Sequence, residues 1–186
     1  MNKFYGVLIL FDEKGNSFVQ NLWQKIADAG ITGAMSQIEN CKPHLSLALY
    51  QGCSVDLIEK KAKEFAEEHN SFEIQFSSFG LFTTPMRPFF LGVTRNEPLN
   101  SIHTKWHEKE GLCENEANTL YKPDSWVPHI TLSMGINKFN YEEALECVFE
   151  THLPFNCMAT TIAITEFDMT DGALVWKYHN IFNFRN

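Results

Sequence analysis

The sequence has little positive charge and no long apolar run. Lysine and arginine number 15 against 23 aspartates and glutamates, which gives a net charge of −8 with the histidines neutral. Because neutralisation of phosphates drives binding to long nucleic acids, this balance argues against a protein that wraps an extended strand. No stretch reaches the roughly 18 apolar residues that a membrane span needs. We therefore expect no membrane association, and at most a small phosphate compound or a strand end as ligand.

Cysteine is sparse, and its spacing gives no pairing pattern. The number is odd and there is no C-x-x-C pair, so neither a disulfide framework nor a zinc-finger pattern is present. We expect free thiols and a cytoplasmic protein. The apolar start, residues 4–11, is followed at once by Asp12-Glu13-Lys14, where a signal peptide would have a small-residue cleavage site. The start is therefore predicted to be a buried strand.

The remaining composition is that of an ordinary globular protein. Hydrophobic residues make up 44% and charged residues 20% of the 186 residues, which excludes a disordered or collagen-like chain. The length suits one domain, and we expect residues 1–186 to form it, with nothing that demands more than a monomer.

The chain contains an internal repeat. Pro43-His44-Leu45-Ser46-Leu47 resembles Pro128-His129-Ile130-Thr131-Leu132, with the histidines 85 residues apart. The same offset places residues 4–7 on residues 89–92, two apolar runs of strand length.

Helix patterns follow these segments in both copies. An amphipathic stripe that Ser17 is placed to cap and Gly30 to end corresponds to a weaker stripe from Pro98. A second helix follows each pentapeptide, capped by Ser54 in one copy and by Asn140 in the other. A strand comes next, from Phe72 and from Phe155.

The unit of strand, helix, strand, helix, strand therefore occurs twice. It predicts an α+β fold with a bilobal, pseudo-twofold duplication: two antiparallel sheets with outer helices and a central cleft. The lobe-level repeats are residues 1–84 and 85–169, and a closing strand, 173–184, follows the turn Asp171-Gly172. The long polar connection 111–126 is expected to be a functional loop.

The two pentapeptides can carry acid-base chemistry. Side chains alternate along a strand, so His44 shares a face with Ser46, and His129 with Thr131, each pair roughly 7 Å apart. Facing each other across a cleft, one neutral imidazole can accept a proton while the opposite imidazolium gives one. The two hydroxyls can donate hydrogen bonds to phosphate oxygens that gain charge. This chemistry needs no metal and no cofactor.

Other interpretations of the histidines stay open. A lone histidine on a strand is usually structural, but two in a repeated context need another explanation. The cleft could bind a nucleotide or RNA end without turnover. A metal hydrolase could use both histidines with Cys41 or a carboxylate, although hydroxyls are what flank each histidine on its face. His103 and His107 have a zinc-compatible spacing but lack the glutamate of H-E-x-x-H, which favours a solvated helix face.

Several further residues are candidates for substrate binding. Arg87 could form a bidentate contact with a phosphate, or be an exposed loop cation. Four others could line the cleft and stack on or contact a base, or else belong to its rim or to the core: Tyr50, Tyr121, Lys122 and Trp126.

The paired motifs, His44-Leu45-Ser46-Leu47 and His129-Ile130-Thr131-Leu132, resemble those of the 2H phosphoesterase superfamily, which includes the 2'-5' RNA ligase (LigT-like, RNA 2',3'-cyclic phosphodiesterase) proteins. The stretch from Phe79 through Arg87 to Val93 is similar to the family's Phe-, Pro- and Arg-containing segment. Ser46 stands where threonine is commoner, and Ser133-Met134-Gly135 where several members have a basic residue.

The resemblance implies a bilobal fold and metal-independent opening of cyclic phosphodiesters, with His44, Ser46, His129 and Thr131 at the catalytic positions. The implied substrate is a small cyclic phosphate or an RNA or tRNA end. RNA 2'-5' ligation, the reverse reaction, is equally compatible with these residues.

Overall fold

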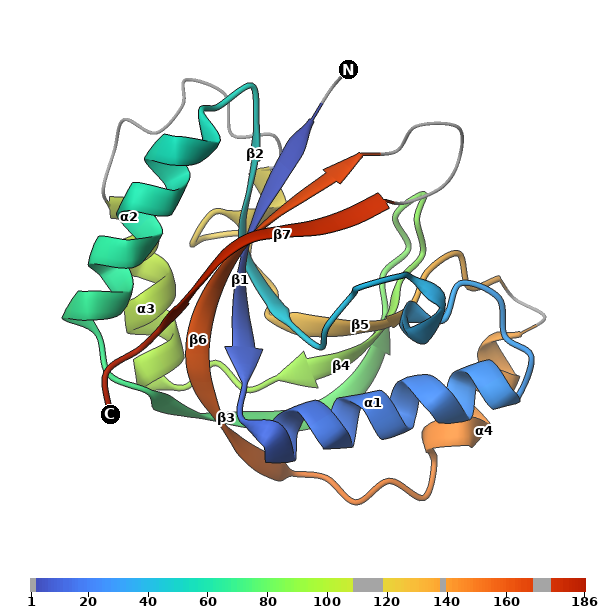
Figure 1. The fold of residues 1–186 in the computed structure, drawn as a ribbon. Coiled ribbons are helices and arrows are strands. Elements are labelled where there is room, and N and C mark those ends of the chain that lie inside the picture. Colours follow the sequence, from blue (N-terminus) through green and yellow to red (C-terminus); the bar gives the residue numbers. More distant parts are fainter. Residues whose placement is uncertain (1–2, 109–118, 138–139, 169–174) are drawn as a thin grey trace.

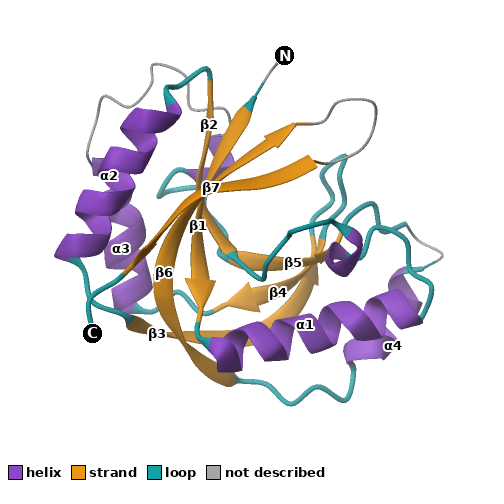
Figure 2. Ribbon diagram, in the orientation of Figure 1, coloured by secondary structure: helices purple, strands orange, loops and turns teal. Residues whose placement is uncertain are grey.

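The computed structural model describes residues 3–108, 119–137, 140–168 and 175–186. Within these ranges, four α-helices cover one seven-stranded antiparallel sheet (Figure 1, Figure 2). The strands are β1 (Phe4–Phe11), β2 (Leu45–Gln51), β3 (Phe72–Leu81), β4 (Phe89–Val93), β5 (His129–Ser133), β6 (Phe155–Asp168) and β7 (Val175–Asn183). The helices are α1 (Glu13–Asp28), α2 (Val55–Glu68), α3 (Glu97–Glu108) and α4 (Tyr141–Val148). The α+β class is confirmed. The turn Asp171-Gly172 and residues 111–118 of the connection 111–126 lie outside the described residues.

The order of the strands in the sheet is symmetric with respect to the two repeats. It is β2-β1-β6-β3-β4-β5, with β7 paired to β6. Exchanging each strand for its counterpart in the other repeat reverses this order, as a pseudo-twofold axis requires. Two antiparallel sheets were predicted, but the structure has one, because β6 joins the strands of both repeats: its start pairs with β3 and its later part pairs with β1 and β7. The third strand of each repeat thus pairs with the first strand of the other.

The register corrects the predicted alignment of the first strands. Leu8 pairs with Ser46 and Phe90 pairs with Thr131, so Leu8 and Phe90 are equivalent, 82 residues apart. The expected match of residues 4–7 with 89–92 is therefore wrong by three residues. In the second repeat, three more residues lie between the first strand and the motif strand than in the first repeat. A comparison at one constant offset cannot reveal such an insertion.

The helices begin close to the predicted positions, with one correction. Asp12, not Ser17, caps α1: its side chain accepts a hydrogen bond from the backbone N–H of Gly15 at 2.8 Å. Ser54 and Asn140 occupy the capping positions of α2 and α4, although neither side chain makes the capping bond. The apolar stripe of α1 is buried as predicted.

The helices form two pairs beside the sheet. Figure 1 shows α2 beside α3 and α1 beside α4. Trp106 of α3 packs against Phe65 of α2, with ring centroids 5.2 Å apart. The first helix of each repeat packs against the motif strand of the other repeat, α1 on β5 and α3 on β2.

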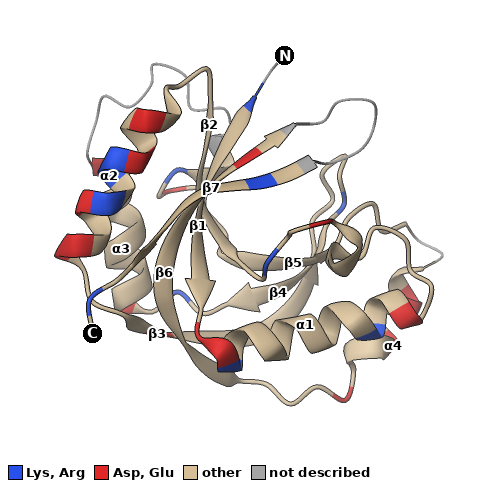
Figure 3. Ribbon diagram, in the orientation of Figure 1, with Lys and Arg blue, Asp and Glu red and all other residues tan. Residues whose placement is uncertain are grey.

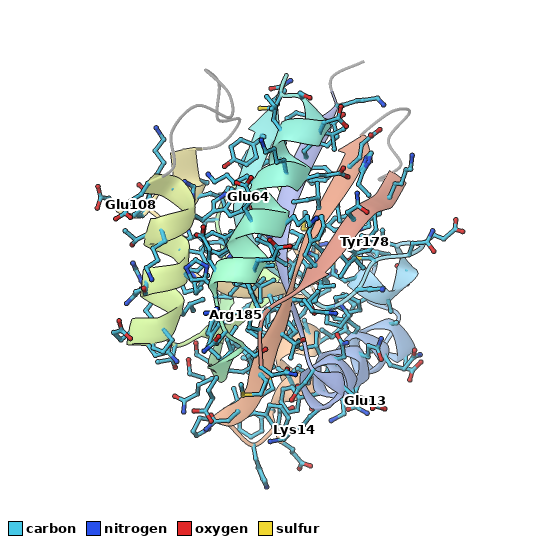
Figure 4. All side chains as sticks on the ribbon, turned by 60° about the vertical axis from the view of Figure 1, so that its left-hand side comes forward. Glu13, Lys14, Glu64, Glu108, Tyr178 and Arg185 are labelled. Atoms are coloured by element: carbon cyan, nitrogen blue, oxygen red, sulfur yellow. The ribbon has the colours of Figure 1, made fainter. Side chains whose placement is uncertain are left out.

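Charged residues gather on the helices and at strand ends, and most of the sheet carries none (Figure 3). Figure 4 shows side chains filling the space between sheet and helices, with exposed residues such as Lys14 and Glu108 at the periphery. None of the described helices is long and apolar enough to cross a membrane.

The cysteines differ from expectation at one position. Cys53 forms a disulfide, so the prediction of free thiols throughout is wrong there. Cys41, Cys147 and Cys157 are free, and Cys113 lies outside the described residues.

Candidate active site

The two motif histidines occupy equivalent places and are held in the same way. His44 directly precedes β2, and His129 is the first residue of β5. The Nδ1 atom of His44 lies 2.7 Å from the carbonyl oxygen of Lys42, and that of His129 lies 2.8 Å from the carbonyl oxygen of Val127. A carbonyl can only accept, so each Nδ1 carries the proton. In each neutral ring Nε2 is therefore the free acceptor.

The two imidazoles lie near each other, and His44 is buried whereas His129 is half-buried. β2 and β5 are the end strands of the sheet path and contact one another. The pKa of His44 is lowered to about 4, chiefly by burial and to a smaller extent by the nearby His129. Burial also lowers the pKa of His129. Both rings are therefore neutral at pH 7 in the free protein.

Aromatic rings lie against both imidazoles. The Trp176 ring lies 5.0 Å from that of His44, between centroids. Phe82 and Phe90 lie 4.9 Å and 5.3 Å from His129 in the same measure. These three residues were missed by the sequence analysis, because they lie on other strands and segments and no spacing connects them with the motifs.

Each hydroxyl residue is followed by a β-bulge. Ser46 pairs with Leu8 and Ala48 with Val7, which leaves Leu47 as an added residue; Leu132 is added in the same way after Thr131. Bulges bend a strand and re-aim its side chains, and they occur beside active sites. The hydroxyl of Ser46 is hydrogen-bonded to the hydroxyl of Tyr121.

The bulge explains why Tyr50 is not beside the histidines. Simple alternation would place Tyr50 on the face of Ser46, but the added Leu47 shifts the phase. Tyr50 therefore pairs with Tyr5 on the core face, where it is buried and its hydroxyl accepts a hydrogen bond from Trp106 Nε1 at 2.9 Å. It offers no ring face for stacking.

The other candidate residues occupy different places. Trp126 is buried, and its Nε1 donates to the carbonyl oxygen of Ser46. Tyr121 reaches the hydroxyl of Ser46. Lys122 and Arg87 are exposed; the carbonyl of Arg87 accepts a hydrogen bond from Ile136, so it lies beside the segment after β5.

Neither alternative metal set is favoured by its surroundings. His103 is buried instead of solvated, is stacked on Trp126, and its pKa is lowered to about 3, chiefly by burial. Burial raises the pKa of the Cys41 thiol to about 12, which disfavours the thiolate that binds metals. In the described ranges, no three His, Cys, Asp or Glu side chains are grouped to hold an ion.

A duplicated α+β fold with two H-x-S/T-x motifs on facing strands is that of a 2H phosphoesterase. The model of the 2'-5' RNA ligase superfamily matches residues 11–171, and the chain belongs to this superfamily.

Solved structures with the same fold cover almost the full length. E. coli LigT complexed with 3'-AMP is 15% identical over 100% of both chains, with a TM-score of 0.61. TT0787 of Thermus thermophilus is 13% identical over 100% of this chain and 99% of its own, with a TM-score of 0.58. A structure described as a phosphoesterase is 16% identical over 99% of both chains, with a TM-score of 0.58. No curated protein sequence gives a match.

Proposed function

We propose that the protein is a metal-independent phosphodiesterase that opens a cyclic phosphodiester, such as a 2',3'-cyclic phosphate on a nucleotide or RNA end. The observation that carries this proposal is the matched pair of imidazoles, each with its Nδ1–H bound to a backbone carbonyl and a hydroxyl residue two positions on. Membership of the 2'-5' RNA ligase superfamily supports it.

In the proposed reaction, each of the two histidines and each of the two hydroxyl residues has one role. One imidazole Nε2 takes a proton from water, whose oxygen bonds to phosphorus, while the opposite imidazolium Nε2–H protonates the ribose oxygen as its bond to phosphorus breaks. Ser46 and Thr131 donate hydrogen bonds to the non-bridging oxygens, which gain charge in the five-coordinate transition state. Each proton has a histidine as donor or acceptor, so the scheme needs no metal ion.

The imidazolium comes from binding itself. Both histidines are neutral in the free protein at pH 7, because burial lowers the pKa of each. A bound phosphodiester places a negative charge between them and raises both pKa values. One ring then takes up a proton, and the other stays neutral to act as the base.

The ligand class is proposed from the surroundings and from relatives. E. coli LigT has been crystallised with 3'-AMP, phosphate, NADP+ and ATP. Here the rings of Trp176, Phe82 and Phe90 flank the histidines, which suits a ligand with a flat base. We therefore propose a single nucleotide or the last nucleotide of an RNA as substrate.

Ligation is the second candidate function. In ligation the 5'-hydroxyl of a second RNA takes the place of water: its oxygen bonds to phosphorus as the bond to the 3' oxygen breaks, which leaves a 2'-5' linkage, and the superfamily is named for this reaction. The same four residues would serve, so direction must be measured by supplying an RNA 5'-hydroxyl end together with a 2',3'-cyclic phosphate end.

The test is hydrolysis of 2',3'-cyclic nucleotides and of a short RNA ending in a cyclic phosphate, with EDTA present. We expect turnover by the wild type and a loss of at least about a hundredfold in His44→Ala and in His129→Ala. His152→Ala, at an exposed histidine after α4, is the matched control and should keep full activity.

Two other results of this experiment would contradict the proposed function. Nucleotide binding without turnover by the wild type would make the cleft a recognition site. Activity that EDTA abolishes and zinc restores would replace the two-histidine scheme with a metal-dependent one.

A further inference from the structure

Two tryptophans hold the backbone of the two hydroxyl residues. Trp126 Nε1 donates to the carbonyl oxygen of Ser46 at 3.1 Å, and Trp23 Nε1 donates to that of Thr131 at 2.9 Å. Both side chains are 2% exposed. The same bond thus occurs at the same place in both motifs, although one donor lies on a helix and the other in a connecting segment. The internal repeat does not relate these donors to each other.

Each indole reaches the motif of the other repeat. Trp23 lies on α1 of the first repeat and binds β5, whereas Trp126, three residues before His129, binds β2. Among the described residues, each of these end strands has one neighbouring strand on the sheet path, and β5 makes one further bridge, from Ser133 to Ala34. The indoles supply a fixed partner at the hydroxyl residue itself, directly before the bulge.

Trp126 also connects the two motifs through a short segment. Its ring is stacked on His103 of α3, with centroids 3.7 Å apart and planes 3° from parallel. The next residue, Val127, provides the carbonyl that binds His129 Nδ1. One end of this segment therefore holds the strand of Ser46, and the other end orients His129.

We propose that Trp23 and Trp126 are positioning residues that fix the directions of the Thr131 and Ser46 hydroxyls relative to the two imidazoles. The inference rests on the function proposed above. These hydroxyls bind oxygens that gain charge only as the reaction proceeds, so misalignment weakens the transition state more than the substrate complex.

The test compares three phenylalanine variants. Trp23→Phe and Trp126→Phe remove the N–H donor and keep a flat apolar ring. Trp106→Phe is the matched control, because Trp106 is fully buried and its Nε1 donates at 2.9 Å to Tyr50, which lies outside the motifs. We expect kcat to fall about tenfold in the first two variants with KM within about twofold, and both constants to stay within about twofold in the control.

Amide hydrogen exchange provides a reading that does not depend on activity. Exchange in residues 45–47 should accelerate in Trp126→Phe, and exchange in residues 129–132 in Trp23→Phe, but neither region should change in Trp106→Phe. If one variant does not fold, the other still carries the comparison.

Two results would overturn the proposal: an equal loss of kcat in the control, or unchanged exchange at the motif strands in both test variants. If the wild type turns over no cyclic phosphate, the proposed function fails, and the exchange data alone decide whether the indoles hold the strands.

Discussion

At the scale of single residues, the surroundings of His44 and His129 determine the pH range in which the pair can work. Both pKa values lie below the ordinary histidine value, His44 at about 4. Burial disfavours the charged ring, so each imidazole holds its proton only in more acidic solution than a solvated histidine would. In the free protein, one imidazole is protonated and the other neutral only at pH values between the two lowered pKa values.

We therefore expect kcat/KM to be maximal on the acidic side of pH 6.5, with its acidic limb near pH 4. The maximum of kcat should lie at higher pH, since a bound phosphodiester anion raises both pKa values. Trp176→Ala, which uncovers His44, should move the acidic limb of kcat/KM towards 6.5. Rates measured from about pH 4 to 9 decide this, and an alkaline limb of kcat/KM above about pH 7 would contradict it.

Some residues of the site could be predicted from the sequence and others could not. The repeated pattern indicates His44, Ser46, His129 and Thr131. The structure places the first two directly before and at the start of β2 and the other two on β5, which contacts β2. Their catalytic roles stay a prediction. Trp176 could not be found, because its contact with His44 depends on the pairing of β7 with β6. A pattern along the chain does not contain such a contact.

At the scale of elements, the two bulges set the direction of each hydroxyl. Hydrophobic periodicity predicted the order of helices and strands well, because each buries an apolar face or stripe. The bulges leave no such mark: Leu47 and Leu132 look like ordinary strand residues, and the added residue is visible only in the pairing. This is why the sequence left Tyr50 open between the cleft and the core, where the structure places it.

The end of β5 is held by a close backbone approach at Gly33. Its φ is +78°, Met134 donates a hydrogen bond to its carbonyl at 2.8 Å, and an added Cβ would lie 2.2 Å from the Met134 carbonyl oxygen. Gly30 has a similar φ of +73° with nothing within 4 Å of an added Cβ. The two glycines therefore share a backbone conformation and differ in crowding.

We expect Gly30→Ala to lower the free energy of unfolding by about 1 kcal/mol, from the left-handed backbone alone. Gly33→Ala should lower it by about 3 kcal/mol, because crowding is added. Only Gly33→Ala should reduce kcat, since it displaces the end of the strand that carries Thr131. Urea unfolding and steady-state kinetics measure both effects; equal losses in the two variants would show that the contact at Met134 has no role.

At the scale of the whole molecule, the exchange of third strands makes the two repeats interdependent. β1 pairs with β6, and β3 pairs with β4, so each repeat lacks part of its sheet without the other. We propose on this ground that residues 1–186 form one domain. The repeat could be predicted from the sequence, but the exchange of third strands could not. A sheet in which each third strand stays in its own repeat and a sheet in which the third strands are exchanged would bury the same residues.

We expect fragments 1–84 and 85–186 to show no cooperative unfolding when prepared separately, and to regain it when mixed. Thermal melts followed by circular dichroism and by tryptophan fluorescence measure this, with the intact chain giving coincident transitions as the reference. A cooperative melt of fragment 1–84 alone would contradict the interdependence.

The pairing of β1 with β6 also has a consequence for biosynthesis. Leu8 pairs with Ala163, so β1 leaves the ribosome long before its central partner exists. At about 5–20 residues per second, this interval is roughly 8 to 30 seconds. During this time the edge of β1 that pairs with β6 in the folded protein stays open, and an open edge can pair with other nascent chains. The duplicated fold thus leaves this edge of its first strand without its partner until the last fifth of the chain has been made.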